Sequence, residues 1–307
     1  MESTARGPLQ DHSLFYRFSW HVPGVGGMFG LLAWLLLGAL FGNVLTLCLM
    51  PFGQDVATEY GTIIAYPVMF IPAMIHSKLQ SRRNMMFETG YTVDSSHFGK
   101  GGAALTAILC MLATVCLAFD MDAINSAMPP MPEWLETALS SMTEGNFMLN
   151  FLSVSIFAPL FEEWLCRGTV LRGLLNYRKA DGSCMNPYAA IVVSALFFAA
   201  IHLNPWQAIP AFAIGCLMGY VYYRTGSLKL TMLMHFANNT LALCAGQSET
   251  LSEYDSWKDF LPGYAYWTIF AAGLLFLVLF ARYISRIETA GAAGNCDEIP
   301  AGSAVTE

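Results

Sequence analysis

Two glutamates and an arginine lie within one otherwise apolar stretch, Phe161-Glu162-Glu163-Trp164-Leu165-Cys166-Arg167. Glu163 and Arg167 are four residues apart, so on a helix they share a face and can form an ion pair. Glu162 points about 100° away from Glu163 at 3.6 residues per turn. Its carboxylate therefore needs a partner on another segment or in water. A structural ion-pair network that holds helices together is the alternative interpretation of both glutamates.

Two histidines and an asparagine lie in later apolar stretches. His202 ends the sequence Phe198-Ala199-Ala200-Ile201-His202, and His235 begins the sequence His235-Phe236-Ala237-Asn238-Asn239. Because His235 and Asn239 are four residues apart, a helix presents the imidazole and the carboxamide on the same face. Asn238 faces elsewhere and is interpreted as a packing or capping residue. His202, taken alone, could simply hydrogen-bond a neighbouring helix.

Together these side chains contain the groups that amide hydrolysis requires: a base, donors for an oxyanion and an acid for the leaving amine. Glu162 can deprotonate a water molecule with help from His202. His235 and Asn239 can donate hydrogen bonds to the tetrahedral oxyanion, and one such donor is worth roughly 3 to 4 kcal/mol in other enzymes. The same atoms could instead hold Zn²⁺ through Glu162, His202 and His235, with an open position for water.

The elements that must position these residues are membrane helices. Hydrophobic residues make up 55% of the 307 residues and charged residues 12%, against roughly 25% charged residues in soluble domains. The net charge of -7 leaves no basic surface for phosphates, which excludes a nucleic-acid partner. We therefore expect an all-α polytopic membrane protein in a lipid bilayer, with about eight transmembrane helices and the active site within the bundle.

Eight apolar stretches are candidates for spanning helices, since about 20 apolar residues cross a bilayer. They cover residues 26–50, 61–76, 101–119, 147–177, 188–203, 206–223, 229–246 and 264–283. The second stretch contains Pro67 and Pro72, which predict a kink. Residues 128–145 predict a short amphipathic helix on the outer interface, starting near Pro132.

The rise per residue decides whether the polar side chains can meet. At 1.5 Å per residue, Glu162 lies about 22 Å below the start of the fourth stretch, and His202 lies about 21 Å above the start of the fifth. His235 and Asn239 lie about 9 and 15 Å above the start of the seventh. These depths permit a common site in the middle of the membrane.

Lysine and arginine are divided unevenly between the two sets of loops. The N-terminus and the segments after every even-numbered stretch carry the basic residues, which are Arg6, Arg17, Lys78, Arg82, Arg83, Lys100, Arg178, Lys179, Arg224, Lys229, Arg282 and Arg286. The segments after the first, third and seventh stretches are acidic and hold one base, Lys258. Because cytoplasmic loops hold the excess of lysine and arginine, both termini are predicted to be cytoplasmic. The protein is expected to be integral and multi-pass, in the cytoplasmic (inner) membrane if it is bacterial.

The ordered set Glu162-Glu163-x-x-x-Arg167, Phe198-x-x-x-His202 and His235-x-x-x-Asn239 resembles the CPBP family of intramembrane proteases. This family is also called the Abi or type II CAAX prenyl endopeptidase family. The resemblance covers about residues 147–246 and includes Gly168 and the turn Thr225-Gly226-Ser227-Leu228. Each motif alone is weak, whereas the set in this order, spacing and membrane setting is specific.

The resemblance implies an endopeptidase whose carboxylate-activated water cleaves a peptide bond within the membrane. Its substrate would be a membrane-associated peptide or protein, which is lipidated in some members. By position, the polar residues take the family's roles: Glu162 as base with His202 beside it, His235 and Asn239 at the oxyanion, and Glu163 with Arg167 in support. The family is often labelled metallopeptidase, while this residue set also suits a metal-free, glutamate-type mechanism. Zinc is thus the one cofactor in question.

The predicted organisation has five segments. These are a cytoplasmic N-terminal segment (1–25), N-terminal transmembrane helices with the outer amphipathic segment (26–146), a CPBP-like catalytic core (147–246), an outer loop with the last transmembrane helix (247–288) and a disordered tail (289–307). The tail is rich in glycine, alanine and acidic residues and has no apolar period.

Two other classes of function stay open at the level of sequence. A transporter would line an ion path with the buried charges, and it predicts inverted repeats and broken helices in paired halves, which the sequence does not display. A non-catalytic immunity or scaffold membrane protein would keep the fold and bind peptides. The intact set of acid and histidine residues argues against this second alternative.

Overall fold

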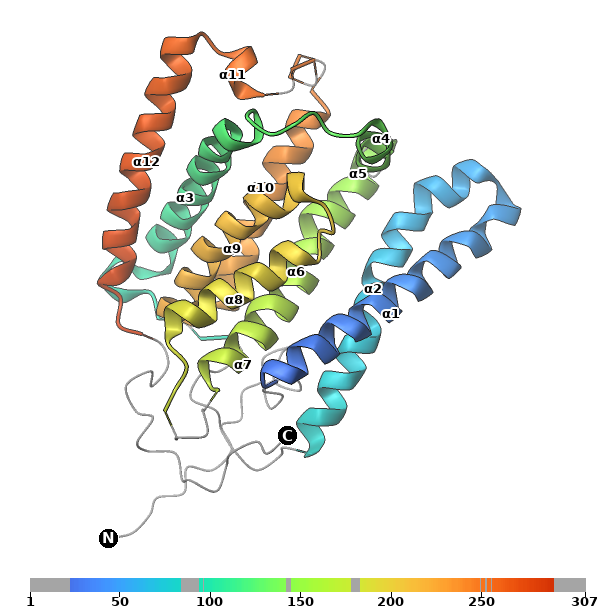
Figure 1. Cartoon of the computed structure of the whole chain (residues 1–307), viewed down its shortest axis with the longest axis horizontal. Helices are drawn as coiled ribbons and strands as arrows, with labels where there is room; N and C mark the ends of the chain where they lie inside the picture. The colour runs from blue at the N-terminus through green and yellow to red at the C-terminus, as the bar shows by residue number, and fades with distance from the viewer. Residues whose placement is uncertain are drawn as a thin grey trace.

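The computed structural model describes residues 23–83, 94–95, 97–141, 145–177, 183–248, 250–251, 253–254 and 256–289. These residues form helices and no strand. The first helices are α1 (Val25–Leu49), α2 (Gln54–Arg83), α3 (Gly102–Asn125) and α4 (Glu133–Ser141). A continuous helical run then comprises α5 (Phe147–Asn150), η4 (Phe151–Phe157), α6 (Ala158–Glu163), η5 (Trp164–Leu171) and α7 (Arg172–Leu175). The last helices are α8 (Pro187–Ala200), α9 (Pro205–Thr225), α10 (Leu228–Gly246), α11 (Trp257–Phe260) and α12 (Gly263–Ser285) (Figure 1).

Each of the eight predicted stretches coincides with a helix or helical run. By length and composition, five are suited to crossing a membrane: Val25–Phe52, Tyr60–Gln80, Gly99–Asn125, Phe147–Leu175 and Gly263–Ser285. Together they make the chain an integral membrane protein. The other three are less suited: α8 is apolar but has 14 residues, about 21 Å, and α9 and α10 carry several polar residues. The count of eight spans therefore remains a prediction.

Two local predictions concern helices outside the candidate core. The second stretch is longer than expected, because α2 has 30 residues and contains both Pro67 and Pro72. The predicted amphipathic helix is present as α4, which begins just after Pro132 and buries Leu135 while Trp134 is 72% exposed. The N-terminal segment up to residue 22 and the tail from residue 290 lie outside the described residues.

The helices of the candidate core begin and end at residues that specify such boundaries. Asn186 precedes Pro187 and caps the N-terminus of α8, and Asn204 precedes Pro205 and caps α9 in the same way. This pairing follows the preference for asparagine at the cap and proline at the first helical position. Gly226 ends α9 in the left-handed region with φ of 63°, where glycine has no Cβ to clash. The chain can then reverse directly into α10.

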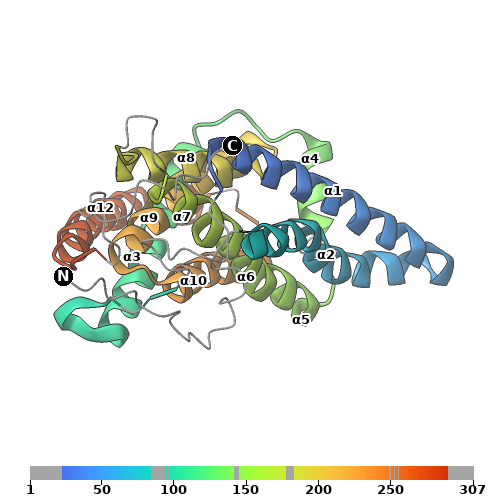
Figure 2. The same cartoon turned by 90° about the horizontal axis from the view of Figure 1, so that it is seen from below.

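Helices α1 and α2 form a closely packed hairpin. A Cβ atom at Gly38 would lie 1.9 Å from the carbonyl oxygen of Met69, and one at Gly42 would lie 2.9 Å from that of Ala65. Small residues thus let the two backbones approach, as is common between membrane helices. Figure 2 shows that much of this hairpin projects to one side of the other helices.

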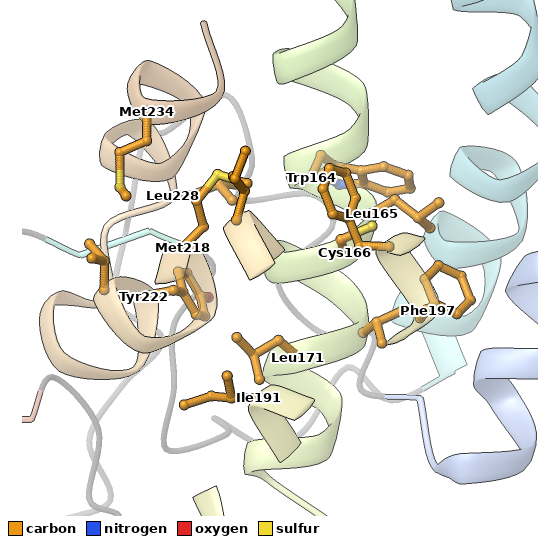
Figure 3. Packing of buried hydrophobic residues seen from close by; sticks show 14 of the residues in the cluster. Trp164, Leu165, Cys166, Leu171, Ile191, Phe197, Met218, Tyr222, Leu228 and Met234 are labelled. Carbon is orange, nitrogen blue, oxygen red and sulfur yellow. The ribbon is translucent and has the colours of Figure 1, made fainter. Parts of the chain in front are cut away.

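A buried apolar cluster joins the helical run to its neighbours. Leu165 and Leu171 of η5, Met218 of α9, and Leu228 and Met234 of α10 are all fully buried in it. Figure 3 shows these side chains together with others from η5, α8, α9 and α10. The cluster fixes the run that carries the two glutamates against the helices that carry the two histidines.

The loops gather at two opposite ends of the bundle. At one end, Ser95 donates its backbone N–H to Gly226 (2.8 Å), and the Arg224 guanidinium donates to the carbonyl oxygen of Ser285 (2.5 Å). At the other end, the Trp206 indole donates to the Pro129 carbonyl oxygen (2.9 Å). In Figure 1, the first end lies at the bottom and the second at the top. The described loops predicted to be cytoplasmic therefore lie together, away from those predicted to be outside.

Candidate active site

The helical run that carries the glutamates is not a regular α-helix. Its segments η4 and η5 are π-helical and lie on either side of α6, which ends at Glu163. The hydroxyl of Thr169 donates to the carbonyl oxygen of Trp164, five residues earlier, at 3.1 Å. π-Helical turns are rare and frequently occur at functional sites. One signal in the sequence is Pro159, whose ring clashes with the preceding turn of a regular helix.

The predicted ion pair between Glu163 and Arg167 is present. Arg167 Nη1 lies 2.6 Å from Glu163 Oε1, and both side chains are fully buried. Arg167 Nη2 also donates to the Gly215 carbonyl oxygen at 3.1 Å, and the guanidinium carbon lies 4.5 Å from the centre of the Phe198 ring. The arginine thus joins the helical run to α9 and α8, so the pair has a structural function as well as an electrostatic one.

His235 of α10 lies between the two glutamates. Its Nδ1 is 3.0 Å from Glu163 Oε1 and its Nε2 is 3.9 Å from Glu162 Oε2. A separation of 3.9 Å is too long for a direct hydrogen bond, and a single water molecule can bridge two groups at such a distance. Glu162, which has no local partner in the sequence, therefore faces an imidazole from a helix some 70 residues later.

Glu162 has a further partner that sequence reasoning did not identify. The hydroxyl of Tyr66, on α2, donates a hydrogen bond to Glu162 Oε1. The two residues are 96 positions apart, and no periodicity or motif links them. Only the packing of α2 against the helical run brings them together, so the sequence offers no signal for this contact.

His202 lies just after the C-terminal end of α8 and, like His235, packs against Phe198. Its ring meets the Phe198 ring edge-on with centroids 5.1 Å apart, and the His235 ring does the same at 5.5 Å. His202 Nδ1 is 2.8 Å from the carbonyl oxygen of Phe198. A carbonyl can only accept, so Nδ1 carries the proton and Nε2 is the free basic nitrogen of the neutral ring. The two imidazoles thus share one aromatic neighbour.

Asn239 lies one helical turn after His235 on α10. Its Nδ2 donates to the carbonyl oxygen of Val154 in η4 at 2.9 Å, and its Oδ1 accepts from Asn238 at 3.0 Å. The carboxamide is therefore held in place by the π-helical segment. The second proton on Nδ2 is the one that a substrate oxygen could accept.

The same side chains do not form a metal centre in this structure. Within the part of the chain that the structure describes, no three His, Cys, Asp or Glu side chains are grouped so that they could hold a metal ion. The zinc set Glu162, His202 and His235 therefore does not fit a metal ion in this arrangement.

The cluster brings acidic and basic side chains together. Two carboxylates face one guanidinium and one imidazole, and the imidazole lies between the two carboxylates. Uncompensated charge is costly in a low-dielectric interior.

The fold and these contacts define a class: an integral membrane protein whose helices join two carboxylates, a guanidinium and an imidazole in one polar cluster. Residues 144–241, less than half of the chain, match the family model described as type II CAAX prenyl endopeptidase Rce1-like. The match confirms the resemblance drawn from the motifs and supports protease activity at the general level. No curated protein matches the chain, and no solved structure does.

Proposed function

We propose that this protein is an intramembrane endopeptidase that hydrolyses peptide bonds of membrane-associated or lipidated peptides. The observation that carries the proposal is the meeting of Glu162, Glu163, Arg167 and His235 inside the segment that matches the endopeptidase family. These residues come from the helical run and from α10, which are distant in sequence. Their meeting therefore indicates a site formed by the fold. Among the described residues, no specific contact favours a transport or a scaffold function.

In the proposed mechanism, Glu162 is the base. Its Oε2 atom is buried, accepts no hydrogen bond from the described residues, and belongs to a side chain that is 12% exposed. Such an oxygen is free to take a proton from a water molecule as that water attacks the scissile carbonyl. His202 assists with its free Nε2, because its Nδ1 is occupied by the Phe198 carbonyl oxygen.

The developing oxyanion is stabilised by His235 and Asn239. His235 donates from Nε2 in its protonated form, while its Nδ1 is oriented by Glu163. Asn239 donates its remaining amide proton, while Val154 holds the carboxamide in position. Donors that are fixed before the reaction need no reorganisation when the charge develops. Glu163 and Arg167 support the site without reacting.

The membrane setting completes the proposal. We infer that all eight helices or helical runs span the bilayer, with α8, α9 and α10 shielded by the longer apolar helices, and that the site lies within the bundle. Both termini face the cytoplasm, and in a bacterium the membrane is the inner one. The buried polar residues of these helices, such as Thr225 of α9 and Thr231 and His235 of α10, then face the protein interior, where polar groups in membranes are tolerated.

The test is cleavage by the purified protein reconstituted in liposomes, followed by mass spectrometry of a peptide panel. The panel contains each peptide with and without a prenyl group. We expect internal cleavage of at least one membrane-bound peptide, and we expect chelators of divalent cations to leave the rate unchanged. Absence of cleavage across the panel would contradict the proposed function. Loss of cleavage on chelation, restored by zinc, would contradict the metal-free mechanism alone.

A further inference from the structure

Tyr66 contributes to the candidate site from outside the segment that matches the protease family. It lies on α2, whereas the matched segment is residues 144–241. Its hydroxyl donates to Glu162 Oε1, and the side chain is partly buried. A tyrosine hydroxyl that enters an apolar region usually finds a hydrogen-bond partner. Here the partner is the carboxylate proposed as the base.

An aromatic stack determines where the Tyr66 ring lies. Phe70, one turn later on α2, stacks on Phe161 with ring centroids 5.2 Å apart and planes 16° apart. Tyr66 packs against Phe70 with centroids 5.7 Å apart. Phe161 directly precedes Glu162 in the chain. The stack therefore aligns α2 with the helical run at the glutamate, and the hydroxyl reaches one carboxylate oxygen.

The two oxygens of Glu162 are in different environments as a result. Oε1 accepts the hydrogen bond from Tyr66, whereas Oε2 accepts none from the described residues and lies 3.9 Å from His235 Nε2. A carboxylate on a flexible side chain can rotate and exchange its two oxygens. A donor on Oε1 fixes that rotation. It leaves Oε2 facing the imidazole, where the reacting water would be activated.

We propose that Tyr66 is a positioning residue that holds Glu162 in its reactive orientation, an inference that rests on the proposed endopeptidase function. A positioned base transfers a proton efficiently only within hydrogen-bond reach of the water. Loss of the hydroxyl therefore lowers the rate of the chemical step. It leaves substrate binding and the aromatic packing of α2 in place, because phenylalanine keeps the ring.

The kinetic experiment compares Tyr66→Phe with Tyr60→Phe in the reconstituted protein. Tyr60 lies on the same helix and is 43% exposed, so its variant controls for removal of a hydroxyl from α2. We expect Tyr66→Phe to lower kcat by about tenfold or more, with little change in KM or Tm, and Tyr60→Phe to behave as the wild type. An unchanged kcat for Tyr66→Phe overturns the proposal. A fall in Tm that accounts for the lost activity also overturns it, since Tyr66 would then be a packing residue.

An infrared experiment tests the contact without relying on activity. The difference spectrum between the wild type and Glu162→Gln identifies the carboxylate band of Glu162. We expect Tyr66→Phe to shift this band and Tyr60→Phe to leave it unchanged, because the Tyr66 hydroxyl donates a hydrogen bond to the carboxylate and the exposed Tyr60 is the control. An unshifted band overturns the proposal. If the wild type cleaves no peptide while the band shifts, the endopeptidase function fails and the Tyr66 contact stands.

Discussion

At the scale of single residues, the cluster combines groups that the sequence predicts with one that it does not. The spacing of Glu163 and Arg167 predicts their pairing, because four residues make one helical turn. The same spacing leaves Glu162 without a local partner, which indicates that a distant group must approach it. Identifying that group as Tyr66 or His235 requires the packing of helices, which a single sequence does not contain.

The buried ion pair makes a prediction about stability. Arg167→Ala removes the cation beside the fully buried Glu163, and stranding one charge costs about 3 to 5 kcal/mol in comparable buried pairs. We expect a lower Tm in detergent together with lower activity. Arg282→Ala, at an exposed arginine on α12, is the matched control and should melt as the wild type does. An Arg167→Ala protein that melts like the control would indicate that Arg167 binds a substrate carboxylate instead.

Asn239 makes the complementary prediction. Asn239→Ala removes a proposed oxyanion donor, and loss of one such donor lowers kcat by roughly 100- to 1,000-fold in other enzymes. Its hydrogen bond to Val154 contributes about 1 kcal/mol to stability by comparison with similar bonds. We therefore expect a large loss of turnover with a small change in Tm, measured on one substrate beside Asn125→Ala as control. Full turnover with a large fall in Tm would assign Asn239 to structure rather than catalysis.

At the scale of elements, the helices were predictable and their local geometry was not. Apolar stretches and asparagine, proline and glycine boundaries predict where α8, α9 and α10 lie. The two π-helical segments beside the glutamates could not be predicted in this way, because the hydrophobic periodicity of a sequence does not distinguish a π turn from an α turn. Pro159, the hydrogen bond from Asn239 to Val154 and the local hydrogen bond from Thr169 to Trp164 favour the wider turns. A regular helix would direct Glu162 and Glu163 differently.

The hairpin of α1 and α2 makes a prediction at this scale because α2 carries Tyr66. Gly38→Ala places a Cβ 1.9 Å from the Met69 carbonyl oxygen, so the two helices must separate. We expect a lower Tm and lower activity. Gly30→Ala, on the same helix with no atom within 4 Å of the added Cβ, should be neutral or slightly stabilising. Equal Tm and activity for the two variants would show that close packing of the hairpin is unimportant.

At the scale of the whole molecule, the loops divide into two ends, and the sequence predicts which end is cytoplasmic. The grouping agrees with contacts such as that of Arg224 with Ser285 at one end and Trp206 with Pro129 at the other. The number of membrane crossings is less predictable, because α8 is short and α9 and α10 carry several polar residues. Their environment depends on neighbouring helices, which hydropathy does not measure.

The orientation is tested by cysteine labelling in intact cells, in a background that lacks the eight native cysteines. Glu136→Cys lies on an exposed position of α4, and Lys100→Cys lies on an exposed position before α3. Because basic loops are retained in the cytoplasm, we expect an impermeant reagent to label position 136 but not position 100. Labelling of position 100 without permeabilisation would contradict the predicted orientation.

The central claim is that Glu162 activates water for peptide hydrolysis, and the turnover of Glu162→Gln tests it most directly. Glutamine keeps the shape of the side chain but cannot take a proton, so we expect turnover to fall by at least about 100-fold with the protein still folded. Glu136→Gln, at an exposed glutamate of α4, should retain full turnover. Near-normal peptide cleavage by folded Glu162→Gln would contradict the account, and loss of cleavage by a folded Glu163→Gln in the same assay would transfer the role to the neighbouring carboxylate.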